Sequence, residues 1–296
     1  MIYVSICIPT KDRVDNLRST IESILSDNVN PSHYQIVISD NSDGNETQEY
    51  INTLDNIKYN IKYYKNPVKG FYNSIKSILI GDGLLLKLHN DYSKFNPGSF
   101  KELVELVIDN QQTKPLLFFT NGSVKNIATY KKYKTFNSFM IKASYLTTWS
   151  SAFSIWKSDL NEIDTSTESV DIMFPHTTLL LKSKNNEFLI YNKVIFQNTT
   201  VEKKGGYNIF YNFCILYLKM LRGTKELTTL TYQKIKWDLY FKFITVWYYR
   251  TIINNKKNYT FDNSNADKNI SIAYGNIGLF TLKIIVRIKK LLMKYQ

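Results

Sequence analysis

The feature that most constrains the fold is a leucine-rich run at residues 84–88, L-L-L-K-L, followed by His89, Asn90 and Asp91. Five residues, four of them leucine, are too few for a helix and are typical of a buried strand. In open α/β sheets, ligands bind at the carboxyl ends of the strands, where a carboxylate can hold a divalent cation. Because Asn and Asp are also common turn formers, a plain strand-to-loop turn is the alternative.

Apolar runs and helical periodicities alternate before this strand. The patterns predict strands and helices in turn at 3–9, 14–25, 34–39, 46–54, 61–65 and 70–80. This alternation favours a mostly parallel α/β sheet with helices on its faces. Asp40 follows strand 34–39 as Asp91 follows strand 84–88, so we expect both acids at one edge, on neighbouring strands.

The second half of the chain gives weaker patterns. A helix at 97–110 and a strand at 116–119 are followed by Lys- and Tyr-rich residues 123–140, for which we predict a surface loop or hairpin. Residues 153–160 are predicted as a strand. After that the expected helices lie at 210–221, 233–253 and 276–295, with a polar stretch at 254–269.

Positive charge is concentrated near the C-terminus. Residues 1–200 carry 21 Lys and Arg against 20 Asp and Glu, whereas residues 201–296 carry 17 against 5. A basic, aromatic-rich region points to an anionic partner, either nucleic acid or an anionic membrane. Zinc-finger spacing, RNP-like motifs and repeats are absent from the sequence, so we favour the membrane and expect no nucleic-acid partner.

Two further patterns bear on the compartment. Cys7 and Cys214 lie among apolar neighbours, which predicts buried, reduced thiols rather than a disulfide framework. The charged residues soon after the first strand argue against a signal peptide, and no window holds 18 uninterrupted apolar residues. We therefore expect a cytoplasmic protein without a transmembrane helix.

Four sequence blocks between residues 3 and 105 carry a resemblance to a known family. They are V-S-I-C-I-P-T-K-D-R, I-V-I-S-D-N-S-D-G, N-P-V-K-G-F-Y-N-S-I and G-D-G-L-L-L-K-L-H-N-D. In this order they resemble family 2 glycosyltransferases of the GT-A fold, and among these the bacterial O-antigen and capsule enzymes of the abequosyltransferase-like kind. The resemblance implies a Rossmann-like, mostly parallel sheet flanked by helices, and inverting transfer of a sugar from a nucleotide diphosphate.

The resemblance also implies a nucleotide-binding set. Its members are Pro9, Thr10, Asp12, Asp40, Asn66, Gly70, Asn73 and Asn90. Asp40 matches the acid that hydrogen-bonds a pyrimidine base. A carboxylate accepts hydrogen bonds, so it suits the N3–H of uracil or thymine and also the amino group of cytosine, which leaves the base open. An Asx turn is the structural alternative for Asp40.

Asp91 matches the metal-binding acid of the family, with Mn²⁺ or Mg²⁺ as the implied cofactor. The family motif usually offers two or three acids, and here only Asp91 follows His89 and Asn90. One carboxylate, diphosphate oxygens and waters still make an oxygen-rich shell, with lower expected affinity. His89 is a weaker candidate ligand.

The predicted base lies in D-I-M-F-P-H-T-T-L-L-L-K, residues 171–182. Relatives open the corresponding helix with an acidic pair and have a basic residue six positions on; His176 and Lys182 hold that spacing. A neutral histidine is a competent base for a sugar hydroxyl, although His176 would also fit a helix-capping role. Asp171 is the second candidate.

A lysine- and glycine-rich segment resembles the family's loop beside the donor diphosphate, with an ordinary linker as the alternative. It comprises Lys203, Lys204, Gly205, Gly206 and Tyr207. We predict a catalytic nucleotide-sugar domain at 1–203 and a basic helical region at 204–296.

The expected acceptor is a glycan or a lipid-linked surface-polysaccharide precursor at the inner face of the cell membrane. In the last helix, Lys283, Arg287, Lys290 and Lys294 form a basic stripe beside an apolar face, which predicts peripheral binding to anionic lipid. Packing of that face on the protein is the alternative. The alternative function is a non-catalytic nucleotide-sugar or polyanion-binding protein on the same scaffold. The sequence predicts no oligomeric state.

Overall fold

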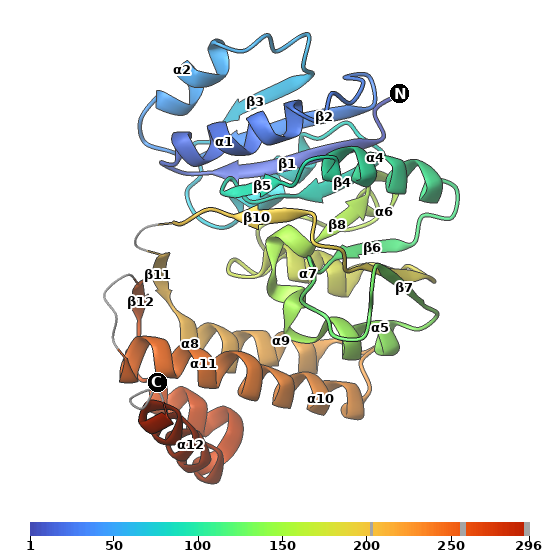
Figure 1. Ribbon diagram of the computed structural model, residues 1–296. Helices are drawn as coiled ribbons and strands as arrows, with labels where there is room; N and C mark the ends of the chain where they lie inside the picture. The colour runs from blue at the N-terminus through green and yellow to red at the C-terminus, as the bar shows by residue number, and fades with distance from the viewer. Residues whose placement is uncertain (202–203, 255–258, 293–296) are drawn as a thin grey trace. The chain divides into compact units, whose positions relative to one another are not determined.

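Strand β1 (Val4–Thr10) lies at the centre of a five-stranded sheet in the computed structural model (Figure 1). The strand order is β3 (Ile61–Lys65), β2 (Tyr34–Asp40), β1, β4 (Leu85–Leu88) and β8 (Ser154–Trp156). The first four strands are parallel and β8 is antiparallel to β4. The mixed α/β architecture with a mostly parallel sheet is therefore as predicted.

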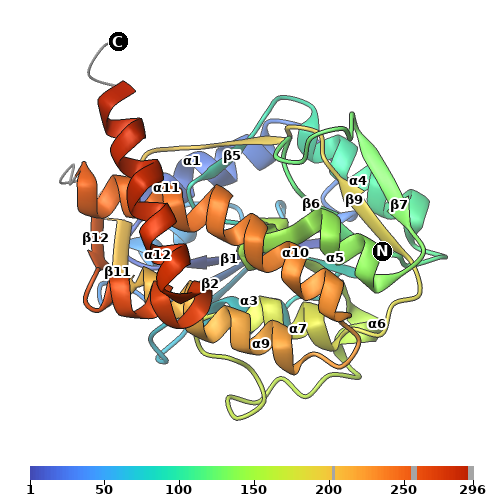
Figure 2. The same cartoon turned by 90° about the horizontal axis from the view of Figure 1, so that it is seen from below.

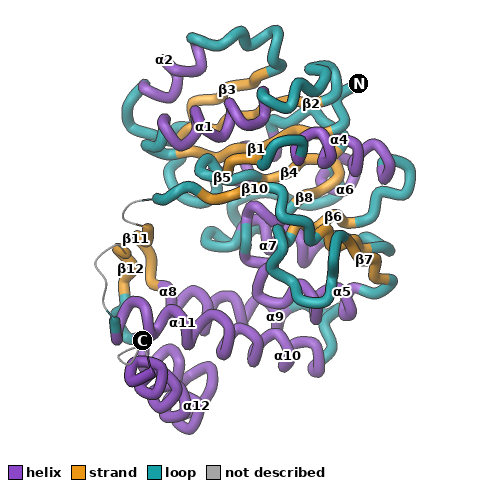
Figure 3. The backbone as a smooth tube through the Cα atoms, viewed as in Figure 1, coloured by secondary structure: helices purple, strands orange, loops and turns teal. Residues whose placement is uncertain are grey.

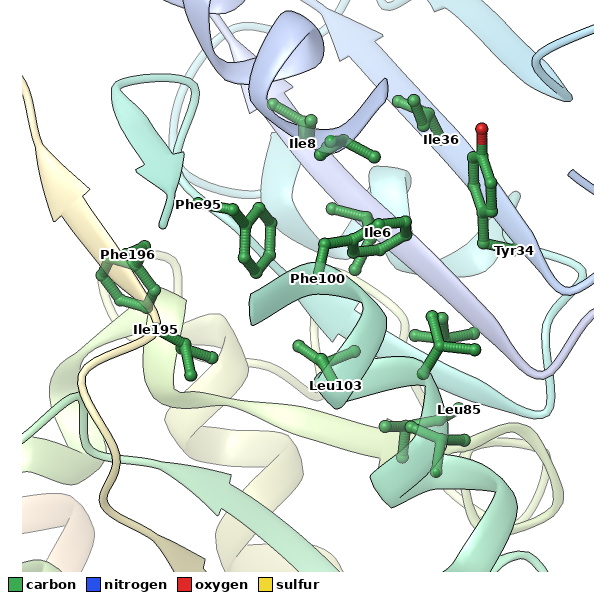
Figure 4. Packing of buried hydrophobic residues seen from close by; sticks show 14 of the residues in the cluster. Ile6, Ile8, Tyr34, Ile36, Leu85, Phe95, Phe100, Leu103, Ile195 and Phe196 are labelled. Atoms are coloured by element: carbon green, nitrogen blue, oxygen red, sulfur yellow. The ribbon is translucent and has the colours of Figure 1, made fainter. Parts of the chain in front are cut away.

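Helices cover the sheet and enclose its core (Figure 4). They are α1 (Val14–Leu25), α2 (Glu46–Asn52), α3 (Asn73–Leu79) and α4 (Ser99–Asn110). Ile6 and Ile8 of β1 belong to one buried cluster with Phe100 and Leu103 of α4. Full burial of each such side chain contributes about 1.5–3 kcal/mol, so this core fixes the sheet whose edge carries the polar residues.

The strand order corrects one expectation about Asp40 and Asp91. They do not end neighbouring strands, because β1 lies between β2 and β4. Thr10, the last residue of β1, is in register with Asp40, so it stands between the two acids. The carboxyl ends of three strands, not two, therefore form the polar edge.

The rest of residues 1–200 packs as smaller sheets and short helices. The strands are β5 (Ser93–Phe95) paired with β10 (Phe196–Asn198), and β6 (Leu116–Phe119), β9 (Phe188–Tyr191) and β7 (Tyr130–Tyr133) in that order. The helices are α5 (Phe136–Ala143), η1 (Ser144–Thr148), η2 (Ser150–Ala152), α6 (Lys157–Leu160) and α7 (Pro175–Lys182).

Two of these elements correct the sequence-based predictions. Residues 123–140 are not only a surface loop, because β7 pairs antiparallel with the buried strand β9 and α5 begins at Phe136. The predicted strand at 153–160 ends at Trp156, and α6 follows it directly.

The structure describes residues 1–201, 204–254 and 259–292, which form two compact units, Met1–Thr200 and Val201–Gln296. The second unit is mainly helical (Figure 3). Its elements are β11 (Lys204–Asn208), α8 (Ile209–Tyr211), η3 (Asn212–Tyr217), α9 (Leu218–Gly223), α10 (Thr229–Leu239), η4 (Tyr240–Ile244), α11 (Thr245–Tyr248), η5 (Tyr249–Ile253), β12 (Tyr259–Asp262) and α12 (Ala266–Leu292). Segments η3, η4 and η5 are π-helical.

Two features of the second unit differ from expectation. The polar stretch 254–269 contains strand β12, which pairs parallel with β11. Among the described residues, one helix, α12, is long and apolar enough to cross a membrane, which the search for uninterrupted apolar runs missed. Gly275 interrupts α12 with a φ of 74°, so its two halves are separate helices across a kink.

Candidate functional site

Three strand ends meet around the buried carboxylate of Asp91. The Thr10 hydroxyl at the end of β1 donates to Asp91 Oδ2 at 2.7 Å, and Arg13 Nε donates to the same oxygen at 2.9 Å. Thr20 of α1 donates to the Asp91 carbonyl at 2.9 Å. We call Thr10, Arg13, Asp40 and Asp91 the strand-end site. Asp91 is thus held by side chains that lie some 70–80 positions earlier in the chain.

The environment of Asp91 fits a carboxylate that lacks one partner. Its side chain is 1% exposed, and burial raises the pKa of the carboxyl although the charge of Arg13 and the Thr10 hydroxyl lower it. Among the described residues, the buried Oδ1 atom has no hydrogen-bond partner. Leaving a buried acceptor unpaired costs about 1–3 kcal/mol, so this oxygen is prepared for a cation or a donor that is not part of the chain.

The chemistry of this oxygen suits it to be a ligand of a divalent cation. Carboxylate oxygen is the ligand that Mg²⁺ and Mn²⁺ prefer, and Asp91 offers one oxygen. In the part of the chain that the structure describes, no group of three or more His, Cys, Asp or Glu is arranged to hold a metal ion. Any cation here must therefore take most of its ligands from a bound nucleotide and water.

Asp40 accepts hydrogen bonds at both carboxylate oxygens. Oδ1 accepts from the Ser42 amide and hydroxyl at 2.9 and 2.5 Å, and Oδ2 accepts from Tyr63 at 2.9 Å and from Lys65 at 3.1 Å. Burial raises the pKa of Asp40, but the combined hydrogen bonds from Ser42, Tyr63 and Lys65 lower it overall. The contact to Ser42 is also the Asx turn that the sequence left open. All four acceptor positions are occupied, so recognition of a base would require one donor to move.

Asn66 and Asn73 tie the loop after β3 to the ends of β1 and β2. Asn73 Oδ1 accepts from Ser39 Oγ at 2.7 Å and from Asn66 Nδ2 at 2.8 Å. Asn73 Nδ2 donates to the carbonyls of Ser39 at 2.8 Å and Thr10 at 3.4 Å. Both side chains are buried, and every hydrogen-bonding position of Asn73 is occupied. These two residues therefore fix the conformation of the predicted nucleotide-binding loop from its buried side.

The remaining predicted loop residues lie closer to solvent. Gly70 has a φ of 101°, a conformation that favours glycine. The exposed Asp12 donates its amide to Ser42 Oγ at 2.7 Å, which links the loops after β1 and β2. Pro9 is half-buried near the end of β1. This edge of the sheet therefore has buried, hydrogen-bonded side chains beneath it and solvent-exposed loop residues around it.

The residues beside Asp91 connect the site to the segment 144–152. Asn90 Oδ1 accepts from Ser150 Oγ at 2.9 Å. Lys87 is fully buried in β4; its ammonium donates to the carbonyls of Leu88 and Ser151, and burial lowers its pKa to about 7. The strand end is thus fixed to η2 on one side.

His89 is a core residue in this structure. It stacks on Phe95 with ring centroids 4.5 Å apart, and its Nε2 lies 2.7 Å from the Ser93 carbonyl. Burial, followed by the charge of Lys87, lowers its pKa to about 3. The weaker proposal that His89 binds a metal has no support in this arrangement, because the ring packs into the apolar cluster instead.

His176 lies in the first turn of α7, near segment 144–152. It is 6% exposed, and burial lowers its pKa to about 4 although a hydrogen bond to the Thr148 backbone raises it. Within the described ranges, Nε2 has no hydrogen-bond partner. The imidazole is therefore neutral at physiological pH with one nitrogen unpaired.

Asp171 forms a turn immediately before this helix. Its Oδ1 accepts from the amides of Met173 and Phe174, both at 2.8 Å, just before the helix begins at Pro175. The helix has no side-chain hydrogen bond at its N-cap residue Phe174, so the structure gives no support to a capping role for His176. Lys182 at the helix end donates to the Ser169 carbonyl at 2.7 Å.

The lysine- and glycine-rich segment lies in the second unit. Lys203 is outside the described residues, as is the side chain of Lys204. Gly205, Gly206 and Tyr207 belong to strand β11 rather than to a loop. A Cβ atom on Gly205 would lie 2.4 Å from the Thr260 backbone, so glycine permits close approach of two strands here.

Three site residues were missed by the sequence analysis. Arg13 was not among the predicted site residues, and its contact with Asp91 spans 78 positions. Tyr63 and Lys65 are two positions apart on β3, so their side chains lie on the same face of the strand. Lys65 is in register with Asp40. The available signal was the spacing of these two polar residues, two positions apart on a strand next to the strand that ends at Asp40.

The comparisons with known proteins agree with this geometry. Residues 5–144 match the family model for Glycosyl transferase family 2. A search of curated proteins finds no match.

Solved structures of S. aureus TarS, each 13% identical to this chain, have a similar fold. Residues 1–349 of TarS in complex with UDP-GlcNAc superpose with a TM-score of 0.63, covering 92% of this chain and 80% of that one. The same TarS segment in a structure titled without a ligand gives 0.62, with 93% and 81% covered. A longer TarS chain gives 0.59, with 85% and 46% covered.

Together these matches show the fold and support a family assignment. The likeness to TarS shows a GT-A fold, and the family match covers the strands that carry the strand-end site. They support a nucleotide-sugar glycosyltransferase. The finer resemblance to abequosyltransferase-like enzymes stays a prediction.

Proposed function

Because residues 5–144 match the family model for Glycosyl transferase family 2, we propose that the chain transfers a sugar from a pyrimidine nucleotide diphosphate to an acceptor hydroxyl, with inversion at the anomeric carbon. The observation that carries the proposal is the strand-end site. There a buried carboxylate with one unpaired oxygen lies within hydrogen-bond distance of a half-exposed guanidinium at the carboxyl edge of a parallel sheet.

In this proposal Asp91 and Arg13 receive the donor diphosphate. Asp91 Oδ1 would hold Mn²⁺ or Mg²⁺, which when bound supplies positive charge for the departing diphosphate. Arg13 is 33% exposed, and its fork of N–H donors suits phosphate oxygens. Thr10 keeps Asp91 oriented at 2.7 Å. The loop shaped by Asn66 and Asn73 would then close over the nucleotide.

Asp40 is proposed to mark the base pocket. Tyr63 and Lys65 occupy its outer oxygen, and Lys65 is half-exposed, so it is the donor that a base would displace most easily. An N3–H group would replace one donor with another at the same oxygen, which keeps the carboxylate satisfied. Uracil and thymine offer this N3–H group, and cytosine offers its amino group instead.

His176 is proposed as the base that takes the acceptor proton, with Asp171 as the second candidate. A neutral imidazole with an unpaired Nε2 has the lone pair that the reaction needs. Its hydrogen bond to the Thr148 backbone fixes the ring through the other nitrogen. Since His176 is buried, the acceptor must enter beside segment 144–152 to reach it. Deprotonation would then permit in-line attack.

The acceptor is proposed to be a glycan or a lipid-linked precursor of a surface polysaccharide. Residues 1–203 would carry the chemistry at the cytoplasmic face of the membrane, and the basic residues 204–296 would bind its anionic lipid.

A non-catalytic nucleotide-sugar-binding protein is the second candidate function. One observation favours it: Asp91 is the single acid at the strand end, and His89 in place of a further acid is packed in the core. Such a protein would bind the donor through the same residues without turnover.

A donor panel separates the two candidates. We expect UDP-, dTDP- or CDP-sugars to raise the melting temperature with Mn²⁺, by the equivalent of about 2.7 kcal/mol at a hundredfold excess over Kd, and GDP-sugars to do so less. The stabilising donor should also release nucleoside diphosphate slowly in the absence of acceptor. Asp40→Asn should weaken the shift.

Each other result has a defined meaning. Stabilisation without turnover, even with candidate acceptors, favours the binding protein. A preference for GDP-sugars removes Asp40 from the base pocket. Absence of any shift across the panel contradicts both functions.

A further inference from the structure

The second half of helix α12 has one face packed inside its own unit. Gly278, Leu282 and Val286 are buried, and the Tyr240 hydroxyl donates to the Gly278 carbonyl at 2.6 Å. Lys283 forms an ion pair with Asp267 at 2.5 Å. Two residues of the apolar face expected from the sequence, Leu282 and Val286, are therefore core residues and not available to a partner.

A second apolar face of the same helix is exposed. Its members are Ile277, Phe280, Ile284, Ile288 and Leu291, which are between 40% and 83% exposed. They recur at steps of three, four, four and three residues. At 3.6 residues per turn these positions fall within roughly 80° of one another, so they form one stripe. We call these five residues the outer stripe.

Basic residues follow one side of the outer stripe. Lys283, Arg287 and Lys290 recur at steps of four and three. At helical spacing Arg287 falls directly beside the stripe, whereas Lys283 and Lys290 fall between the stripe and the buried face. Lys289 instead lies over the Tyr249 ring at 5.0 Å. The helix thus presents an apolar stripe with a cationic border, as helices that lie in a membrane interface do.

Two aromatic side chains near the start of the stripe are also exposed. Trp237 and Phe241 are 42% and 54% exposed and stack with ring centroids 6.1 Å apart. Trp237 lies 5.7 Å from Tyr274, which directly precedes the kink. The indole of Trp237 carries an N–H group, and such rings are favoured at the boundary between lipid and water, while the Phe241 ring adds exposed apolar area.

Charge decides which occupant fits this surface. Residues 201–296 carry 17 Lys and Arg against 5 Asp and Glu, so a second copy would place one strongly cationic surface against another. An anionic bilayer satisfies both the apolar stripe and its basic border. If α12 crossed the bilayer, Lys283, Arg287 and Lys290 would lie in the hydrocarbon region. Its buried face would also lose contact with the rest of the unit.

We propose that α12 lies in the interface of an anionic bilayer, with the outer stripe in the acyl boundary and Arg287 and Lys290 at the headgroups. Trp237 and Phe241 anchor the neighbouring part of the unit. Figure 2 shows α12 crossing α11 within this unit, so the two helices are not parallel. The inference rests on the membrane part of the proposed function and assigns it residues and an orientation.

The test uses the full chain with vesicles of phosphatidylcholine containing roughly 30% phosphatidylglycerol, a composition that supplies an anionic surface. The variant Ile277→Gln/Ile284→Gln/Ile288→Gln alters exposed residues only, so it should fold. We expect it to lower vesicle partitioning on the order of 10²-fold. Arg287→Gln/Lys290→Gln should lower it about 25-fold at low salt, since each basic residue contributes about fivefold.

The matched control is Ile272→Gln, an exposed isoleucine on α12 that precedes the kink and is outside the stripe. It should partition like the wild type. High salt should release the wild type, and neutral vesicles should bind it weakly.

Several results would overturn the proposal. They are wild-type partitioning by the triple variant, equal binding to neutral and anionic vesicles, resistance to alkaline carbonate extraction, which indicates a spanning helix, and a concentration-dependent dimer that the triple variant dissolves. Donor-induced thermal shifts measured on the same variants keep the two proposals separate. Vesicle binding without any donor shift would leave the membrane inference standing and contradict the proposed transfer.

Discussion

Replacing Asp91 with asparagine is expected to abolish sugar transfer without lowering the stability of the fold. Burial raises the pKa of the Asp91 carboxyl, so its stabilising contribution is present at acid pH and is lost as pH rises through the folded pKa. Above the folded pKa the ionised carboxylate, with its Oδ1 atom unpaired, therefore costs folding free energy. Asparagine removes this cost and keeps an oxygen that accepts from Thr10.

The loss of transfer should be large. A bound divalent cation contributes several kcal/mol to a transition state with developing charge, so removing its carboxylate should lower kcat about 10³-fold or more. The measurements are kcat, donor affinity with and without Mn²⁺, and the melting temperature. Asp82→Asn is the matched control, because Asp82 precedes β4 at its opposite end and pairs with Lys62 and Lys157 near the surface. Wild-type turnover and a retained Mn²⁺ effect in Asp91→Asn would show that Asp91 holds no metal.

Replacing His176 with glutamine is expected to lower kcat by about 10²–10⁴-fold with donor affinity nearly unchanged. Glutamine keeps an N–H donor for the Thr148 backbone but is not a base. Because the pKa of His176 is lowered to about 4, the wild-type rate should stay level as pH falls through 6.5 and should decline only toward pH 4. The measurement is a pH–rate profile for each protein.

A stability profile checks that the substitution acts as intended. A lowered pKa means that the unfolded chain binds more protons between pH 4 and 6.5, so wild-type stability should fall as pH falls through this window. His176→Gln should flatten that slope. Asp171→Asn is the companion variant, since its amide oxygen can still accept from Met173 and Phe174. Full activity in His176→Gln together with loss in Asp171→Asn would assign the base to Asp171.

Local sequence patterns were sufficient to predict the strands that carry the site. β1, β2 and β4 are nearly uninterrupted apolar runs that end in polar residues, and such runs are typical of strands buried on both faces. The start of α7 was also visible, because Pro175 is favoured in the first helical turn. These features depend on residues that are close together in the chain.

The missed features depend on residues that are far apart. The position of β1 between β2 and β4 comes from tertiary pairing, which no local pattern encodes. The contact of Arg13 with Asp91 and the donors around Asp40 arise only once those strands pair. In α12, apolar residues lie on both the buried face and the outer stripe, and only packing shows which is which.

The most direct test of the central claim is amide hydrogen exchange with and without UDP and Mn²⁺, because it locates the nucleotide without assuming a donor sugar. We expect protection in the loops that follow β1, β2, β3 and β4, at residues 11–13, 41–44, 67–72 and 89–92, which surround the strand-end site. Residues 81–83, at the opposite end of β4, should be unchanged. Protection that is absent from these loops, or confined to the basic residues 204–296, would contradict a nucleotide diphosphate at the carboxyl edge of this sheet.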